Sequence, residues 1–363
     1  MADLRERGGA FAGGCSGKVG RAELETALAP LAGRRPRSGR GVARVVDLGD
    51  AHRVELTAPA QCLVTSADLL YNLCEDPHQY GYVAVVHGLS DIYAVLGTPL
   101  WATVTVGTRT ARADVRSVEL VMRGVCDALR DNGAVLAGGH TVYAHDPFIG
   151  VAASGRAAAE RADSAPRAGD AILLSKPLGT GIALSAVRLG LVLESQLRAE
   201  YASMRASNGV VAALLRAALC RQPGCVRYVT DVSGFGLLAA LRQGLARGSR
   251  AKAVLGESIP AFALTFALIE QGAWSALADD NMAGSMAYVS SDGGPLPLAQ
   301  QILLNDPQTS GGLLAIVSAQ AAVELLEEAA VAGAALTEVG RIEPAAPGER
   351  GAIVVSASAR AAA

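Results

Sequence analysis

Residues 114–139 read DVRSVELVMRGVCDALRDNGAVLAGG, and this stretch decides the class of fold. Its apolar residues recur every three or four positions, which predicts an amphipathic helix over 114–131. The dipeptide Asn132-Gly133 supplies a stop for that helix. The apolar residues 135–137 then predict a short strand that leads into two glycines. Helix, turn and strand in direct succession indicate a chain of interleaved helices and strands.

The same alternation extends outward in both directions. On the N-terminal side we expect strands at 42–48, 61–65 and 100–106 and a helix at 79–95. On the C-terminal side we expect strands at 171–175, 226–230, 313–318 and 352–356 and helices at 209–219, 234–245 and 321–332. Both halves are therefore predicted to be α/β or α+β domains.

A polar, alanine-rich stretch at 156–168 is the best candidate for a domain boundary. The chain has 363 residues, which exceeds the usual size of one domain. We therefore expect a mobile Gly/Arg-rich segment with a catalytic loop over 1–41, an N-terminal domain over 42–158 and a C-terminal domain over 168–358.

Composition excludes several classes of function. The 32 basic and 34 acidic residues are interspersed without a dense basic stripe, and aromatic residues make up only 4%. Nucleic acid is therefore not an expected partner. No apolar run approaches the roughly 20 residues that span a bilayer, and the polar start is unlike a secretory signal. Six scattered cysteines are then expected to be reduced thiols in the cytoplasm.

A glycine-rich string, GGCSGK at 13–18, is the first candidate for chemistry. Glycines leave backbone N–H groups exposed, which suits a loop that closes over an anion. Lys18 lies three residues from Cys15, and a nearby cation favours the reactive thiolate. The spacing is not that of a P-loop. On this string alone, a disordered tail with a chance cysteine is the favoured interpretation.

Three aspartates beside apolar segments form the second candidate: Asp68, Asp91 and Asp231. A carboxylate at a strand end, next to a glycine-opened helix, is well placed for a magnesium–phosphate complex, because the helix offers N–H groups and the carboxylate takes the metal. For each aspartate singly, a role in a turn or as a helix N-cap is the alternative.

Two further strings are polar and rich in glycine. Residues 138–141 read GGHT and are expected to form a tight loop where the backbone passes close to a ligand. Residues 305–312 read NDPQTSGG and, taken alone, predict a helix-to-strand turn before the strand at 313–318.

Taken together, these strings resemble motifs of selenophosphate synthetase, also called selenide, water dikinase. Residues 89–94, 136–140, 230–238 and 306–314 each match a family motif, in the family's order, from about residue 60 to 345. The resemblance implies an α+β fold with the two-domain architecture of aminoimidazole ribonucleotide synthetase. It also implies a homodimer that pairs N-terminal domains, and conversion of ATP, selenide and water into selenophosphate, AMP and orthophosphate.

The resemblance further implies a set of site residues. Catalysis falls on Cys15 and Lys18; ATP binding on Lys18, Asp68, Asp91, Gly139, His140 and Thr141; and metal binding on Asp68, Asp91 and Asp231. The implied cofactor is Mg²⁺, with K⁺ left open, and a downstream selenium-using enzyme is the implied recipient of the product.

The chain departs from the family pattern at several positions. Where the family has a pair of aspartates, one of them a magnesium ligand, this chain has Gly41 and Val42, so that Asp47 or Asp50 substitutes or one metal site is weakened. Gly17 replaces a second loop cysteine, His87 replaces an asparagine, and residues 276–278 replace a Gly-Gly-Thr turn although Asn281 remains. Two rival functions therefore stay open: phosphoryl transfer to another acceptor, and nucleotide binding without turnover.

Overall fold

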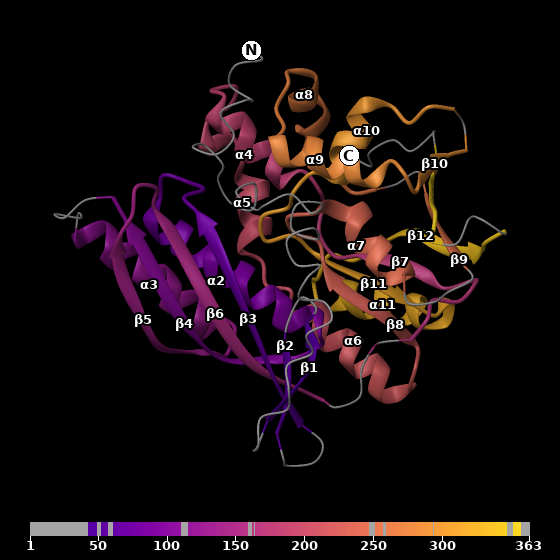
Figure 1. The fold of residues 1–363 in the computed structure, drawn as a ribbon, viewed down its shortest axis with the longest axis horizontal. Helices are drawn as coiled ribbons and strands as arrows, with labels where there is room; N and C mark the ends of the chain where they lie inside the picture. Colours follow the sequence, from indigo (N-terminus) through magenta and orange to yellow (C-terminus); the bar gives the residue numbers. More distant parts are fainter. Residues whose placement is uncertain are drawn as a thin grey trace. The chain divides into compact units, whose positions relative to one another are not determined.

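The computed structural model (Figure 1) describes ten stretches of the chain. They are residues 43–48, 52–56, 61–109, 115–158, 162, 164–246, 251–256, 259–292, 294–346 and 351–356, the first two as backbone only. The chain divides into two compact units. The first unit comprises Met1–Arg161 and Met204–Gly209, and the second comprises Ala162–Ser203 and Val210–Ala363.

The first unit is built on one sheet with helices against it. Its strands are β1 (Ala43–Leu48), β2 (His52–Leu56), β3 (Gln61–Tyr71), β4 (Thr98–Thr108), β5 (Val135–Tyr143) and β6 (Phe148–Ala158), and its helices are α2 (Pro77–Ala94) and α3 (Val115–Asp131). The strand order is β1-β2-β3-β6-β4-β5, which Figure 1 shows from one edge to the other. Neighbours are antiparallel, except that β4 and β5 run parallel.

Alternation along β3 decides which face of this sheet is covered. Val64 and Leu70 are buried, whereas Leu69 is 41% exposed. Because successive side chains of a strand point to opposite faces, the even-numbered residues of β3 face the core. Helix α2 packs on this covered face, against β3 and β6, and α3 packs on α2.

Helix α2 has well-defined ends and little exposed surface. The Asp76 side chain accepts a hydrogen bond from the backbone N–H of His78, at 2.9 Å, and Pro77 occupies the first turn. Nearly every residue from Tyr80 to Ala94 is buried. A Cβ at Gly81 would lie 2.1 Å from the carbonyl oxygen of Val121, so only glycine allows α3 to approach this closely. The helix is therefore packed closely against both the sheet and α3.

The second unit carries a larger mixed sheet and most of the helices. Its strands are β7 (Ala171–Leu174), β8 (Val226–Asp231), β9 (Ala251–Leu255), β10 (Val289–Ser291), β11 (Leu313–Val317), β12 (Thr337–Pro344) and β13 (Ile353–Val355), in the order β10-β13-β9-β12-β7-β11-β8. The helices are α4 (Thr180–Arg188), η4 (Glu194–Gln196, a 3₁₀ helix), α5 (Arg198–Arg205), α6 (Gly209–Arg221), α7 (Gly236–Leu245), α8 (Thr265–Glu270), α9 (Ala276–Ser285), α10 (Leu298–Asn305) and α11 (Ala319–Val331).

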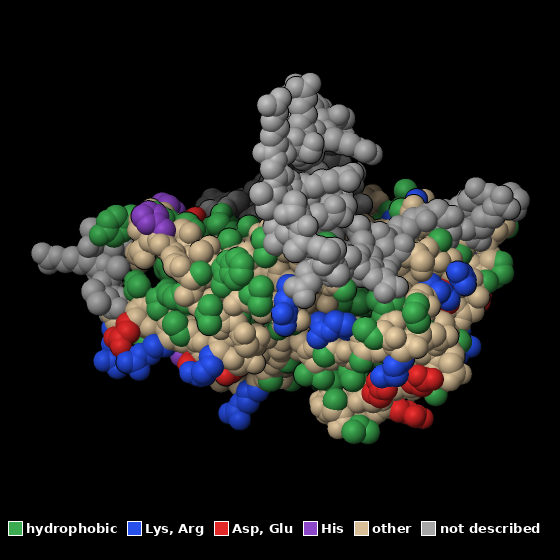
Figure 2. All heavy atoms as spheres, turned by 90° about the horizontal axis from the view of Figure 1, so that it is seen from below, with side chains coloured by type: hydrophobic (Ala, Val, Ile, Leu, Met, Phe, Trp, Pro, Cys, Tyr) green, Lys and Arg blue, Asp and Glu red, His purple; other side chains and the backbone are tan. Residues whose placement is uncertain are grey.

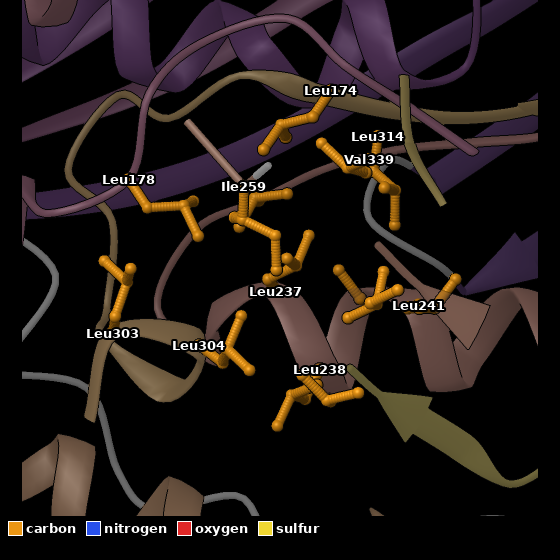
Figure 3. Packing of buried hydrophobic residues seen from close by; sticks show 14 of the residues in the cluster. Leu174, Leu178, Leu237, Leu238, Leu241, Ile259, Leu303, Leu304, Leu314 and Val339 are labelled. Atoms are coloured by element: carbon orange, nitrogen blue, oxygen red, sulfur yellow. The ribbon is translucent and has the colours of Figure 1, made fainter. Parts of the chain in front are cut away.

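The core of the second unit gathers around α7. Leu237, Leu238 and Leu241 of this helix meet Leu174 of β7 and Leu314 of β11 in one buried cluster (Figure 3). Each of these side chains is at most 1% exposed. Full burial of a leucine contributes roughly 1.5–3 kcal/mol, so this cluster is a main source of stability for the unit.

The α+β fold with two units agrees with the expected class, and one local expectation is wrong. Strand β5 continues to Tyr143, so residues 138–141 lie within a strand and not in a tight loop. Gly138 has φ of +151°, and the pairing of β5 with β4 shifts at this point, which marks a bulge. Residues 276–278 form the first turn of α9. None of the helices in the described ranges is long and apolar enough to cross a membrane.

Candidate active site

Two of the predicted carboxylates, Asp68 and Asp91, lie at the contact between strand β3 and helix α2. The Ser66 hydroxyl of β3 donates to Oδ2 of Asp91 on α2. Two residues along the strand, Oδ2 of Asp68 lies 3.1 Å from Nε2 of His87 on the helix. We call these four residues the β3–α2 seam. Strand positions 66 and 68 share a face, and helix positions 87 and 91 are one turn apart, which is why the contacts fall in register.

A further hydrogen bond joins the same strand and helix. The Tyr80 hydroxyl donates to the backbone carbonyl of Leu70 at 2.7 Å. Burial raises the pKa of Tyr80 above its ordinary value, so the hydroxyl stays neutral and acts as a donor. The strand and the helix are therefore fixed to one another beyond the end of the seam.

The two members of each contact differ in exposure. The His87 side chain is fully buried, whereas the Asp68 side chain is 13% exposed. Ser66 is also buried, and Asp91 is half-buried. Buried groups thus hold two carboxylates that are themselves only partly buried. Asp68 lies within a strand and Asp91 within a helix, so neither is the turn residue or N-cap that was the alternative.

The predicted ATP contacts on β5 lie in the same sheet as Asp68. Paired residues connect Asp68 with Val151 of β6, Val104 of β4 and then Gly139 of β5. At about 4.8 Å per strand, this row separates Gly139 from Asp68 by roughly 14 Å. Alternation then puts Thr141 on the face of Asp68 and His140 on the opposite face. Their role in binding ATP stays a prediction.

Asp231, the third predicted carboxylate, ends β8 in the second unit and is 6% exposed. It lies opposite Leu313 of β11. A buried cation, Lys176, lies near it and donates from Nζ to the Ser310 carbonyl at 2.9 Å. Burial lowers the pKa of Lys176 to about 7, and the negative charge of Asp231 opposes this shift. Metal binding by Asp231 stays a prediction.

The loop 306–312 forms the expected helix-to-strand connection, from α10 to β11, and it also caps another helix. Oε1 of Gln308 accepts hydrogen bonds from the backbone N–H groups of Gly179 and Thr180, at 3.0 and 3.3 Å. Oδ2 of Asp306 accepts from the N–H of Gly181 at 3.0 Å. These are the first N–H groups of α4, the place where a helix usually attracts an external anion. In this chain the loop's own side chains occupy it.

Burial and close packing explain the unusual composition of this loop. Burial raises the pKa of Asp306 to about 7, while hydrogen bonds from Ile182, Gln308 and Gly181 act in the opposite direction. A Cβ at Gly311 would lie 2.0 Å from the carbonyl oxygen of Val232. This family motif is therefore a packing element of the second unit.

Asn281, which the sequence retains beside an altered turn, has a similar role. Its Nδ2 donates to the carbonyl oxygens of Gly234 and Asn305, both at 3.0 Å. The contacts join α9 to the segment before α7 and to the end of α10. Asn281 thus fixes the start of the loop 306–312.

Several residues were not identified by sequence reasoning. Ser66 could have been found, because it lies two positions before Asp68 and so shares its strand face. Lys176 and Asn208 gave no local signal, since their partners are distant in the chain. Cys15, Lys18 and Asp50 lie outside the described residues, as does the side chain of Asp47.

Oxygen ligands of the seam fit a magnesium–nucleotide complex. Among the described residues, no group of three or more His, Cys, Asp and Glu side chains could hold a metal ion alone. Magnesium in nucleotide sites usually takes one or two carboxylates and completes its shell with waters and phosphate oxygens. Asp68 and Asp91 supply two hard oxygen donors of this kind.

The described residues on one face of the molecule (Figure 2) show no continuous basic stripe of the kind found at nucleic-acid interfaces. Figure 2 shows Lys and Arg side chains of the described residues in separate groups on this face, with Asp and Glu among them. A continuous basic stripe, which phosphate backbones require, is not visible on it.

Sequence comparison identifies both halves of the chain. The AIR synthase related protein N-terminal domain matches residues 48–157, and the C-terminal domain of the same name matches residues 167–351. A selenide, water dikinase from Desulfitobacterium hafniense (strain Y51) is 32% identical over 90% of this chain and 94% of its own length. Another, from Burkholderia orbicola, is 35% identical over 73% of this chain and 74% of its own length.

A solved structure agrees at the level of the fold. Thiamine monophosphate kinase from Aquifex aeolicus superposes with a TM-score of 0.62 at 16% identity, over 94% of this chain and 98% of that one. With two domain matches that together span most of the chain, and relatives above 30% identity over most of their length, the resemblance drawn from the motifs is confirmed: the chain belongs to the selenide, water dikinase family.

Proposed function

We propose that this protein converts ATP, selenide and water into selenophosphate, AMP and orthophosphate. The observation that carries the proposal is the β3–α2 seam in a chain of this family: two carboxylates, Asp68 and Asp91, each fixed by a buried partner. Family membership supports the choice of reaction, and the seam supports a charged, pre-organised nucleotide site.

In the proposed site, Asp68 and Asp91 bind the nucleotide through Mg²⁺. Carboxylates and phosphates repel one another, so a bound cation supplies the charge that joins them. Ser66 and His87 orient the carboxylates before the nucleotide arrives, because each contact already exists in the protein alone. Such pre-organisation reduces the reorganisation that the reaction would otherwise require.

The remaining roles follow from the motifs. Lys18 neutralises charge on the transferred phosphoryl group, and Cys15 handles selenide. Asp231 is a further magnesium ligand, and Gly139, His140 and Thr141 contact ATP. We assign these functions to a segment over 1–41, an ATP-binding domain over 42–158 and a C-terminal domain over 168–358. K⁺ is a second candidate ion.

A second copy of the chain is the proposed partner of the first unit. The sheet face opposite α2 carries Leu69, which is 41% exposed, and Ala67 beside it. An apolar sheet face is stabilised by burial against another sheet. Leu69→Asp is therefore expected to shift sedimentation from dimer to monomer; an unchanged dimer would exclude this face.

We further propose a cytoplasmic protein whose product passes to a selenium-using enzyme.

The nucleotide product distinguishes this function from its rivals. Incubation with ATP and Mg²⁺, with and without selenide under anaerobic conditions, is followed by chromatography of the nucleotides. AMP that forms only with selenide is the expected result. ADP that forms regardless of selenide would favour another acceptor, and ATP-induced thermal stabilisation without turnover would favour a nucleotide-binding protein.

A further inference from the structure

One short segment of the chain leaves the second unit and packs into the first. Met204–Gly209, which we call the strap, belongs to the first unit, whereas the residues on both sides of it belong to the second. It joins the end of α5 to the start of α6. The strap contacts helix α2 and the residue directly after α3, both more than 70 residues earlier in the chain.

Two contacts attach the strap to α2 and to the end of α3. The guanidinium carbon of Arg205 lies 3.9 Å from the ring centroid of Tyr82. The Ser207 hydroxyl donates to Oδ1 of Asn132, which also accepts from the Tyr93 hydroxyl at 2.9 Å. These contacts hold the strap, and neither touches the β3–α2 seam.

The third contact has a different target. Nδ2 of Asn208 donates to Oγ of Ser90 at 2.9 Å. The two residues are 3% and 1% exposed, so the hydrogen bond is shielded from water. Ser90 directly precedes Asp91, whose carboxylate accepts from Ser66 on β3.

We propose that Asn208 is a positioning residue for the Asp91 carboxylate. Adjacent helix residues project about 100° apart, so Ser90 and Asp91 are held from two directions, by the strap and by β3. Two anchors on consecutive residues fix the rotation of the last turn of α2 about its axis. Loss of one leaves a buried hydroxyl without this donor and allows the turn to move. The role of Asp91 in binding rests on the proposed function.

The test compares Asn208→Ala with Ser207→Ala, which removes a strap contact that does not involve Ser90 or Asp91. Ser90→Ala and the Asn208→Ala/Ser90→Ala double variant complete a mutant cycle. The first readout is amide hydrogen exchange of residues 90–94 in the full-length protein without ligand. The second is the Mg²⁺ concentration that gives half-maximal thermal stabilisation by ATP.

Asn208→Ala is expected to speed exchange in the last turn of α2 and to raise the half-maximal Mg²⁺ concentration about 3- to 10-fold, the range for one buried hydrogen bond. Ser207→Ala is expected to change neither value more than about twofold, and the double variant is expected to equal Ser90→Ala alone. Fully additive single effects, or equal effects of Asn208→Ala and Ser207→Ala, would overturn the proposal.

The exchange experiment separates this inference from the proposed function. If the wild-type protein shows no stabilisation by ATP and Mg²⁺, the proposed function fails. Faster exchange at 90–94 in Asn208→Ala alone would then still assign the anchoring of this turn to Asn208, and unchanged exchange would overturn that as well.

Discussion

The β3–α2 seam and the loop 306–312 contain similar polar side chains that have different roles. In the seam, buried partners hold Asp68 and Asp91, whose side chains remain partly exposed. In the loop, Asp306 and Gln308 are fully buried, and their side-chain oxygens accept hydrogen bonds from backbone N–H groups at the start of α4. In the sequence, single aspartates beside apolar segments indicated the seam, and a polar, glycine-ended string indicated the loop. Their difference shows that a motif can mark a family through a requirement of packing.

The largest expected effect is a loss of turnover when a carboxylate of the seam is removed. Asp68→Asn and Asp91→Asn are each expected to lower turnover by about 100-fold or more, since a charge that binds the nucleotide complex is lost. AMP formation measures this effect, and circular dichroism checks that the fold is kept.

Asp127→Asn is the matched control in the same unit. Asp127 is an α3 carboxylate that lies 2.8 Å from a ring nitrogen of His78, away from the seam. Its turnover is expected to stay within about twofold of the wild type, the size of a surface effect. Near-normal turnover in both seam variants would remove the seam from the active site.

The loop is expected to respond in stability. Gln308→Ala removes the acceptor of two buried N–H groups, of Gly179 and Thr180, and is expected to cost about 1–3 kcal/mol in the free energy of unfolding. Urea denaturation measures this cost. Gln320→Ala on the exposed face of α11 is the control, with a change within about 0.5 kcal/mol. Equal stability of both variants would contradict the capping role.

Much of this comparison could be predicted and part of it could not. Among the described residues, alternation and helical periodicity located eight of the thirteen strands and half of the ten α-helices, because apolar spacing reports directly on burial. Strand β6, which lies between β3 and β4 in the first sheet, was missed. Asp68 and Asp91 were found as candidates, but their position at one contact between two elements depends on the packing of α2 on β3. The capping of α4 by Gln308 joins residues 128 positions apart, and no local pattern reports such a contact.

The pH dependence of stability sharpens the contrast further. Burial raises the pKa of Asp306 from 3.8 to about 7 in the folded state. The folded protein therefore holds this proton more tightly than the unfolded chain, so its contribution is complete below pH 3.8 and is lost as pH rises through about 7. Asp306→Asn is expected to remove this loss.

Urea titrations of the wild type and Asp306→Asn across that pH window measure the difference. The free energy of unfolding of the wild type relative to the variant is expected to fall from acid to neutral pH. A difference that stays constant across the window would show that Asp306 does not titrate in this way.

The smallest expected effect concerns the helix that carries half of the seam. Asp76→Ala removes the N-cap of α2, whose side chain accepts from the backbone of His78. The expected cost is about 1 kcal/mol, with turnover at saturating ATP unchanged, since the seam lies at the other end of the helix. Thermal unfolding and steady-state kinetics check the two parts. A large loss of turnover would show that the seam depends on the whole helix.

The most direct test of the account is phosphorus NMR of the protein with ATP, Mg²⁺ and selenide under anaerobic conditions. We expect a phosphate signal split by coupling to selenium, which appears together with AMP and orthophosphate and is absent in Asp91→Asn. A wild-type spectrum that shows only ADP and orthophosphate, or unchanged ATP, would contradict it.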